Sequence, residues 1–308
     1  MMATLASIVH ILVALSLAPL LPAVIHRIKA WVAGRRGSPM LQTYRDLWKL
    51  LQRGTVISRT TTGLIVVGPV VGLACVAAAL TIVPLGGVPG LLTFSGDFLL
   101  MAYLFGLMRF VTILAALDTG SSFEGMGASR EAFFSALAEP ALLLGLAALI
   151  APNGYGSLST AYASVNWAAM TSPVGPAWLL VAAALIIVFL AENARIPVDD
   201  PNTHLELTMI HEAMVLDHGG PDLAMIQYAA SLKLWTLGAL IVGLLVPVRS
   251  GWWCVDLAAG VAGQFALAAV VGAIESTIAR LRLVRVPQFL VAASVLSILA
   301  LVLVTRQS

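Results

Sequence analysis

Residues 63–83 read GLIVVGPVVGLACVAAALTIV, which is 21 residues without a charged side chain. An α-helix rises about 1.5 Å per residue, so roughly 20 mostly apolar residues cross the hydrocarbon core of a bilayer. The internal Gly and Pro residues are tolerated better in membrane helices than in soluble ones. This stretch therefore predicts a membrane-spanning helix.

Similar apolar stretches recur on both sides of this segment. Seven further candidate spans cover about 4–26, 97–117, 132–151, 176–194, 225–247, 254–279 and 286–305. Of all 308 residues, 60% are hydrophobic and only 10% are charged, whereas soluble domains carry about 25% charged residues. So few charges cannot cover a water-facing surface. We therefore expect an all-α integral membrane protein with about eight transmembrane helices, in a single multi-pass domain over residues 1–308.

The Lys and Arg residues are unevenly distributed among the loops. The segment between the first two spans holds eight of the 17, and most others follow odd-numbered spans. Because positively charged loops stay in the cytoplasm, both termini are expected outside.

The first stretch lacks a basic n-region and is expected to be a retained helix rather than a signal peptide. The small net charge of +2 does not favour a nucleic-acid partner.

Three cytoplasmic segments, about 27–62, 118–131 and 195–224, are longer than simple turns. Residues 41–51 within the first have an amphipathic pattern, which predicts a helix lying against the membrane surface. We expect these extended amphipathic loops to dock a soluble partner, and ordinary solvated loops are the alternative. The candidate docking residues are Arg35, Arg36, Gln42, Arg45, Asp46, Lys49, Asp118 and Glu131.

Several ionisable side chains lie within the candidate spans, where they are costly and mark functional sites. Arg109 lies in the third span, and Glu139, Glu192 and Glu275 lie in the cytoplasmic halves of three others. Three acids at similar depth could line one hydrated cavity and exchange protons, because burial raises a carboxylate pKa and a nearby Arg lowers it. The alternative is that each acid pairs with an Arg to fix helix packing.

The long segment after the fifth span adds a concentration of titratable groups. A chain of His and carboxylate side chains can relay protons, because His titrates near neutral pH. Val215 stands where a metalloprotease motif beginning at His211 would place its second His, and the two cysteines lie far apart, so no metal site is predicted in this chain. The candidate relay residues of this segment are Asp199, His204, Glu206, His211 and Glu212, with Arg195 at its start.

Four stretches of sequence resemble the membrane subunit shared by respiratory complex I and the group 4 energy-converting [NiFe] hydrogenases. They are RRGSPMLQTYRDLWKL (35–50), DTGSSFEGMGASRE (118–131), AENARIPVD (191–199) and HLELTMIHEAMVL (204–216). The second is similar to the hydrogenase branch, the third to complex I, and the fourth to formate-hydrogenlyase-like members of the hydrogenase branch. Glu139 follows Arg130 by nine residues, which matches a glutamate of the family. Asn202, His204 and Glu275 depart from the complex I pattern, which favours the hydrogenase branch.

The resemblance implies a non-catalytic subunit of an oxidoreductase complex in a bacterial or archaeal cytoplasmic (inner) membrane. It implies that Glu139, Glu192, Glu206 and Glu275 line a proton channel and that Arg130 and Arg195 orient them by ion pairing. It also implies that the chain anchors hydrogenase large and small subunits and an iron–sulfur subunit, beside antiporter-like membrane subunits. The [NiFe] centre and the iron–sulfur clusters would then reside in those partners, with no cofactor in this chain.

Two other functions remain open at this point. The chain could form the quinone site of a complex-I-like dehydrogenase, and nickel-binding Cys-x-x-Cys pairs in a partner encoded by a neighbouring gene would exclude that. It could also be a standalone ion carrier, which predicts transport by the purified chain in liposomes without any partner.

Overall fold

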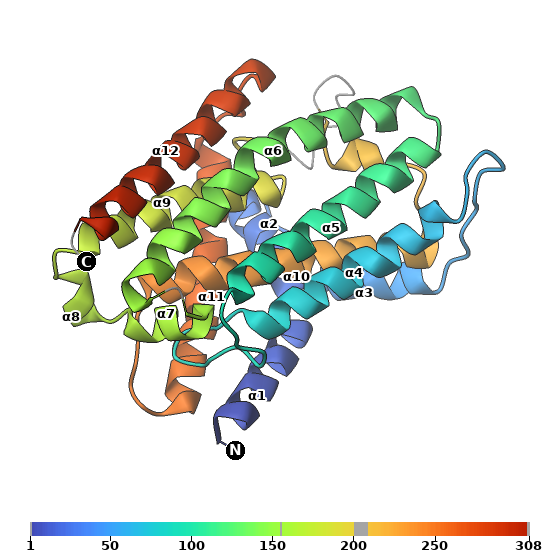
Figure 1. The fold of residues 1–308 in the computed structure, drawn as a ribbon. Coiled ribbons are helices and arrows are strands. Elements are labelled where there is room, and N and C mark those ends of the chain that lie inside the picture. Colours follow the sequence, from blue (N-terminus) through green and yellow to red (C-terminus); the bar gives the residue numbers. More distant parts are fainter. Residues whose placement is uncertain (1, 155, 200–208, 307–308) are drawn as a thin grey trace.

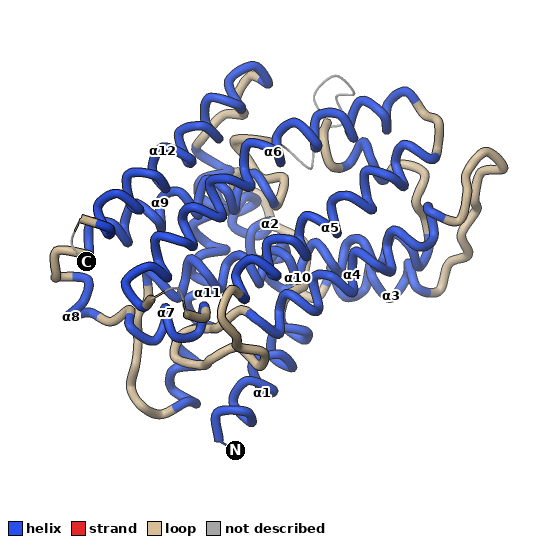
Figure 2. Tube along the Cα trace, viewed as in Figure 1, coloured by secondary structure: helices blue, strands red, loops and turns tan. Residues whose placement is uncertain are grey.

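The computed structural model describes residues 2–154, 156–199 and 209–306, and these residues contain helices and loops but no β-strand (Figure 2). Seven helices are long and apolar enough to cross a membrane, or eight if the bent pair α1–α2 counts as one span. The prediction of about eight transmembrane helices in an all-α protein is therefore confirmed. The orientation of the termini stays a prediction.

The first predicted span is broken in two. Helix α1 (Met2–Leu17) and helix α2 (Leu20–Val32) meet at an angle of 47°. The helix breaks at Pro19, because proline has no backbone N–H to donate and its ring clashes with the preceding turn. Helix α1 consequently projects away from the other helices, while α2 packs along α11 (Figure 1).

The other long helices form one bundle. They are α4 (Leu64–Ile82), α5 (Asp97–Asp118), α6 (Ser122–Ile150), α9 (Gly175–Glu192), α10 (Gly220–Leu245), α11 (Trp253–Thr277) and α12 (Val286–Thr305). Helix α10 is the central one, since 83% of its most apolar window is buried, against 28% for α12. Small residues allow close approach between helices. A Cβ on Gly68 of α4, for example, would lie only 3.2 Å from Ala115 Cβ of α5.

Short helices connect these spans. The 3₁₀ helix η1 (Ala151–Asn153) and the helices α7 (Leu158–Ser164) and α8 (Trp167–Met170) lie between α6 and α9. Two more 3₁₀ helices, η2 (Glu212–Val215) and η3 (Leu283–Arg285), precede α10 and α12. The amphipathic helix expected over 41–51 is present as α3 (Gln42–Leu51), which buries Leu47 and exposes Trp48. The predicted helix is confirmed, and its position against the membrane surface stays a prediction.

Two expected boundaries were wrong. Helix α6 begins at Ser122, so most of the segment 118–131 is helical rather than a loop. Its Gly and Ser residues suggested a loop, but these first turns pack against η2, whose contacts compensate for their low helix propensity. Helix α10 begins at Gly220 rather than near 225, with Pro221 in its first turn, where the missing N–H costs nothing.

Candidate functional site

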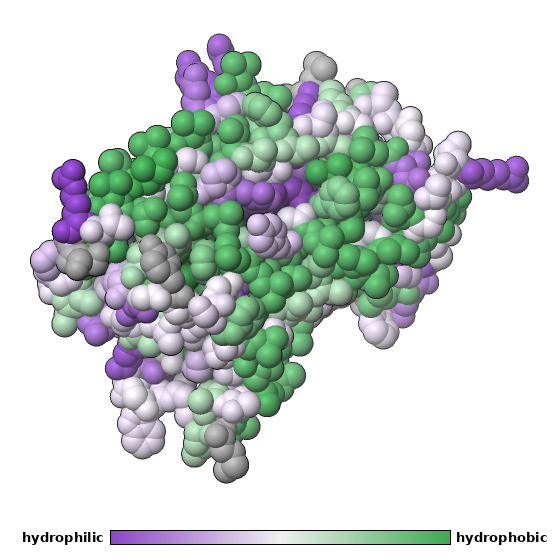
Figure 3. Space-filling view, in the orientation of Figure 1, coloured by the Kyte–Doolittle hydropathy of each residue, from purple (hydrophilic) through white to green (hydrophobic). Residues whose placement is uncertain are grey.

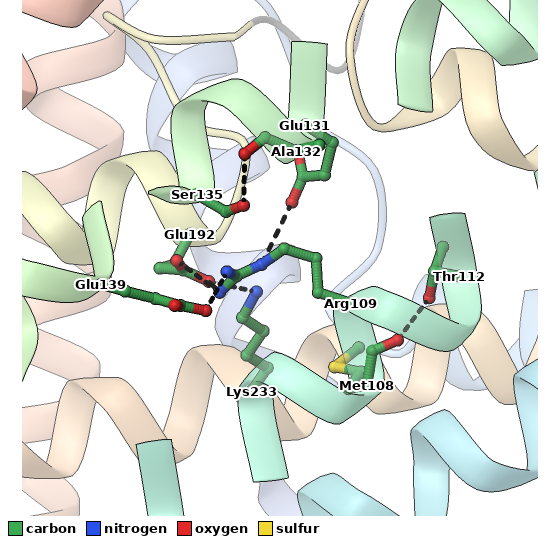
Figure 4. Close-up of polar contacts among 9 residues, drawn as sticks. All are labelled: Met108, Arg109, Thr112, Glu131, Ala132, Ser135, Glu139, Glu192 and Lys233. Carbon is green, nitrogen blue, oxygen red and sulfur yellow. Dashed lines mark hydrogen bonds and ion pairs between the residues drawn. The ribbon is translucent and has the colours of Figure 1, made fainter. Parts of the chain in front are cut away.

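Arg109 of α5 is the centre of a buried charge cluster in the bundle. Its guanidinium lies 2.7 Å from Glu139 Oε1 of α6 and 2.8 Å from Glu192 Oε1 of α9. Glu131 of α6 lies 3.7 Å from Arg109 Nε. Figure 4 shows the three carboxylates pointing toward the guanidinium from two helices. The planar guanidinium can donate to several acids at once, which explains why an Arg stands at this position.

Lys233 of the central helix α10 extends the cluster. Its Nζ lies 2.8 Å from Glu192 Oε2, so Glu192 is held between two cations (Figure 4). Three ion pairs thus run in series from Lys233 through Glu192 and Arg109 to Glu139. The cluster contains two cations and three carboxylates. It becomes neutral when one carboxylate carries a proton, and a low-dielectric environment favours that neutral state.

Burial differs strongly along this series of charges. The side chains of Glu192, Arg109 and Lys233 are 5%, 7% and 9% exposed, whereas that of Glu139 is 44% exposed. Glu139 therefore lies where the buried charges reach the outer surface of the bundle. A hydrophilic patch lies between α5 and α6 on an otherwise largely apolar face (Figure 3).

A second charge cluster involves Glu275 of α11. Lys29 Nζ of α2 lies 2.8 Å from Glu275 Oε2, and Arg195 Nη1 lies 3.5 Å from Glu275 Oε1. Glu275 therefore does not join the ion pairs of Glu139 and Glu192, and the cavity that the three acids were expected to share stays a prediction. Helix α11 places Glu275 against α2 instead, so it ties α2 and the start of the 195–199 turn together.

The segment after α9 is held in place by Asp199. Its Oδ2 accepts hydrogen bonds from the backbone N–H groups of Ile210 and His211, at 3.3 and 3.4 Å. Its Oδ1 lies 3.0 Å from Arg280 Nη2. These contacts bring both ends of the 199–210 segment together beside α11. His204 and Glu206, two of the predicted proton-relay residues, lie outside the described residues.

A cavity of about 420 Å³ lies between α2, α3, α9, α10 and the segment around η2. Ligand pockets commonly measure about 300–1,000 Å³, so this one is large enough for a small molecule or several waters. Glu192 and Lys233 form part of its wall, which joins it directly to the Arg109 cluster. Its other ionisable lining residues are His26, Asp46, Arg195, Asp199, His211 and Glu212.

His211 is a wall residue whose protonation is disfavoured. Burial, together with the nearby Lys233 ammonium, lowers the pKa of His211 from 6.5 to about 4. The imidazole is therefore neutral at pH 7. A neutral imidazole can donate one hydrogen bond and accept another, which suits both a water chain and a polar ligand.

Three other predicted site residues make contacts that differ from the expected ones. Arg130 makes no ion pair among the described residues and instead donates to the backbone oxygen of Met209 at 3.0 Å. Asp118 accepts the backbone N–H of Thr62 at 2.6 Å, which anchors the start of α4. Glu131, predicted as a docking residue, belongs to the Arg109 cluster.

The remaining docking candidates separate into two groups. Arg35, Arg36, Arg45 and Lys49 have exposed side chains, as a docking surface requires. Gln42 and Asp46 of α3 are joined by a 2.8 Å hydrogen bond and line the cavity.

Lys233 is the residue that sequence reasoning missed. It lies inside the candidate span 225–247, so the rule that picked out Arg109 applies to it equally. Its acid partner, Glu192, is 41 positions away in the sequence and only the packing of α9 against α10 brings them together. Among the described residues, no group of three or more His, Cys, Asp or Glu side chains is arranged to hold a metal ion.

Comparisons with known proteins agree with the resemblance drawn from the loop motifs. Formate hydrogenlyase subunit 4 of Escherichia coli (strain K12) is 29% identical over 288 residues, which is 92% of each chain. Hydrogenase-4 component C of the same strain is 31% identical over 243 residues, covering 76% of this chain and 72% of that protein.

The fold is also that of a solved membrane complex subunit. A chain of the membrane-bound sulfane sulfur reductase, an archaeal respiratory membrane complex, matches with a TM-score of 0.82 and 19% identity, over 99% of this chain and 100% of that one. The family model described as NADH dehydrogenase matches residues 5–306. This multi-pass membrane protein therefore belongs to the NADH dehydrogenase family.

Proposed function

We propose that this chain is the membrane anchor and proton-conducting subunit of a membrane-bound group 4 [NiFe] hydrogenase complex of the formate-hydrogenlyase type. It would hold the hydrogenase large and small subunits and the iron–sulfur subunit at the cytoplasmic face of a bacterial or archaeal inner membrane. It would also couple electron transfer in that peripheral arm to proton movement through the membrane. The formate hydrogenlyase and hydrogenase-4 relatives support the hydrogenase assignment.

One observation carries the proton role. A cavity bordered by the cytoplasmic segments meets a series of ion pairs that ends at Glu139. With Glu131 beside Arg109, the carboxylates of the whole cluster outnumber its cations by one. Glu192 is held between Lys233 and Arg109 and stays charged, so a proton arriving through the cavity passes along the cluster and is taken up at Glu139, where the series reaches the surface. The permanent cations orient the acids, and the surplus carboxylate gives the cluster its capacity for one proton.

The experiment uses the complete complex, purified with its partners and reconstituted in liposomes. Glu139→Gln keeps the side-chain shape and cannot hold the proton. We expect hydrogen evolution driven by a soluble electron donor to persist, while proton movement measured with an internal pH dye falls at least tenfold. Asp217→Asn, an exposed acid outside the cluster, is the control and should leave both rates unchanged. Undiminished proton movement in Glu139→Gln would refute the channel role.

The cavity itself favours a second candidate, the quinone site of a complex-I-like dehydrogenase. The neutral imidazole of His211 and the ammonium of Lys233 could both donate hydrogen bonds to a quinone carbonyl. This function predicts that the purified complex reduces decylubiquinone and contains no nickel. Nickel in the complex, with hydrogen evolution insensitive to added quinone, would exclude it.

A further inference from the structure

The break between α1 and α2 leaves backbone carbonyls of α1 without donors from their own helix. Pro19 has no N–H, so Leu15 O, four residues earlier, loses the hydrogen bond that a continuous helix would give it. Ser16 O belongs to the same last turn, where helix carbonyls need partners from outside the helix. Lipid tails cannot donate hydrogen bonds, so other parts of the protein must satisfy these carbonyls.

Two tyrosines from different helices supply the missing donors. Tyr228 of α10 donates its phenol hydroxyl to Leu15 O at 2.8 Å. Tyr44 of α3 donates its hydroxyl to Ser16 O. The first tyrosine belongs to the most buried spanning helix of the bundle, and the second belongs to the amphipathic helix at its surface. The hinge between α1 and α2 is therefore held from two sides, and we call Tyr44 and Tyr228 the hinge clasp.

The two helices that meet at the hinge are not equally well fixed. On α2, Lys29 pairs with Glu275 of α11, and a Cβ on Gly272 would lie only 3.0 Å from Ile28 Cβ. Helix α1 has no Lys, Arg, Asp or Glu and projects from the bundle (Figure 1). Its buried residues are mostly small, so few of its side chains interlock with neighbouring helices; they are Ala6, Ser7, His10 and Ala14. Helix α2 is therefore the fixed base of the hinge, and α1 is the helix that can change its angle.

Helix α3 is tied tightly to the bundle at its far end. A Cβ on Gly220 at the start of α10 would lie 2.8 Å from Arg53 O, so the residues just after α3 pack closely on α10. The segment before α3, residues 33–39, is exposed throughout. Tyr44 lies in the first turn of α3, beside the exposed Arg45. A partner that binds the basic side chains of α3 therefore acts on the end of the helix that carries the Tyr44 hydroxyl.

We propose that the hinge clasp makes the angle of α1 depend on the position of α3, and that the attached peripheral arm keeps Tyr44 on Ser16 O. With the arm attached, both tyrosines donate and α1 stays at 47° to α2. Without the arm, the Tyr44 contact opens, because it is exposed and nothing holds α3 in place, and α1 swings about Pro19. This inference rests on the proposed function, because it takes the peripheral arm as the partner of α3.

The consequence reaches the other end of α1. There Ser7 Oγ donates to the backbone oxygen of Pro89, in the connection between α4 and α5, at 2.9 Å. A swing of α1 breaks this contact and uncovers the inner face of the helix. Attachment of the arm at α3 is thereby registered at the opposite end of the bundle.

The test measures how readily the inner face of α1 is reached by a thiol reagent in native membranes that contain the whole complex. Ala6→Cys places a thiol at a position that is 1% exposed, in a chain that also carries Cys75→Ala and Cys254→Ala. N-ethylmaleimide reacts first, and a gel shift of the denatured chain with polyethylene glycol maleimide then counts its unreacted thiols. Cysteines of the partner subunits do not affect this readout. Leu5→Cys, 48% exposed on the same turn, supplies the reference rate at this depth.

Removing one hydroxyl separates the hinge from folding. Tyr44→Phe should raise the labelling rate of Ala6→Cys, relative to that of Leu5→Cys, at least fivefold. Tyr103→Phe, at a tyrosine of α5 that is 70% exposed, is the matched control and should leave the relative rate unchanged. An unchanged rate in Tyr44→Phe, or an equal rise in Tyr103→Phe, would overturn the proposal.

Washing the peripheral arm off the membranes with concentrated salt tests the dependence on α3. Arm-free membranes should label Ala6→Cys as fast as Tyr44→Phe does, and combining the two changes should add nothing, because both break the same contact. Equal rates with the arm attached and removed would overturn the proposal. The proposed function fails separately: if Tyr44→Phe leaves labelling unchanged while Glu139→Gln still blocks proton movement, the proton role stands and the hinge clasp does not.

Discussion

Lys233 on α10 and Glu192 on α9 lie 2.8 Å apart at the wall of the cavity, and both side chains are more than 90% buried. This contact joins the cavity between α2, α3 and the segment around η2 to the charges inside the bundle. Arg109 Nη2 donates to both oxygens of Glu192, and Arg109 Nη1 donates to Glu139. The Lys233–Glu192 pair is therefore the entrance to the proposed proton path.

Removing Lys233 should destabilise the protein. Lys233→Met retains most of the side-chain volume but leaves the buried Glu192 with Arg109 as its remaining cation. Loss of one partner of a buried pair costs about 3–5 kcal/mol, so the melting temperature in detergent should fall by several degrees. Lys49→Met, at an exposed position of α3, is the matched control and should change stability by less than about 0.5 kcal/mol. Equal melting temperatures for both variants would contradict the structural importance of the pair.

Reversing the charge of Arg45 should weaken the attachment of the peripheral arm. Arg45 is exposed on α3, within the basic segment expected to dock that arm. Like-charge contacts at an interface cost enough that Arg45→Glu should reduce the peripheral subunits recovered by co-purification by on the order of tenfold. Arg306→Glu makes the same reversal at the exposed end of α12 and should leave recovery unchanged. Full recovery with Arg45→Glu would mean that this segment is only solvated.

Gly127 and Gly125 of α6 form a natural matched pair. A Cβ on Gly127 would lie 2.9 Å from both Ala213 Cβ and Ile210 O, whereas a Cβ on Gly125 would meet nothing within 4 Å. Gly127→Ala should therefore push the segment around η2 away from α6 and lower the melting temperature. Gly125→Ala should raise it slightly, because alanine has the higher helix propensity by about 1 kcal/mol. Opposite signs in a thermal unfolding assay would confirm the close packing of η2 on α6, and equal effects would argue against it.

His211 should make the protein less stable in mild acid. Its pKa is about 4 in the folded protein and 6.5 when unperturbed. Above 6.5 the imidazole is neutral in both the folded and the unfolded state. As the pH falls from 6.5 toward 4, the unfolded chain gains a proton that the folded chain does not, so stability is progressively lost.

The variant His211→Gln removes this titration. The fall in melting temperature between pH 7 and pH 5 should therefore be smaller than in the unchanged protein, when both are measured in the same detergent. His218→Gln is a useful companion, because burial also lowers the pKa of His218 and its contribution should have the same sign. An identical pH dependence with and without His211 would show that its imidazole is already solvated in the folded protein.

The sequence by itself determined the membrane architecture. Runs such as 63–83 must be helical in a bilayer, because backbone N–H and C=O groups find no other partners there. Amphipathic spacing was also sufficient to predict α3 over 42–51. The intramembrane charges could be recognised one at a time because each is costly at its own position, and the loop motifs were enough to indicate the family.

Only the tertiary structure decided which charges meet. Helical periodicity specifies the face and depth of a residue within its own helix, but the rotation of each helix against its neighbours depends on how their side chains interdigitate. Glu275 therefore pairs with Lys29 rather than joining the ion pairs of Glu192, and within the part of the chain that the structure describes Arg130 binds a backbone oxygen rather than an acid. For the same reason the role of Lys233 could be recognised only from the packing of α10 against α9. That packing places its ammonium between the cavity and the buried series of ion pairs.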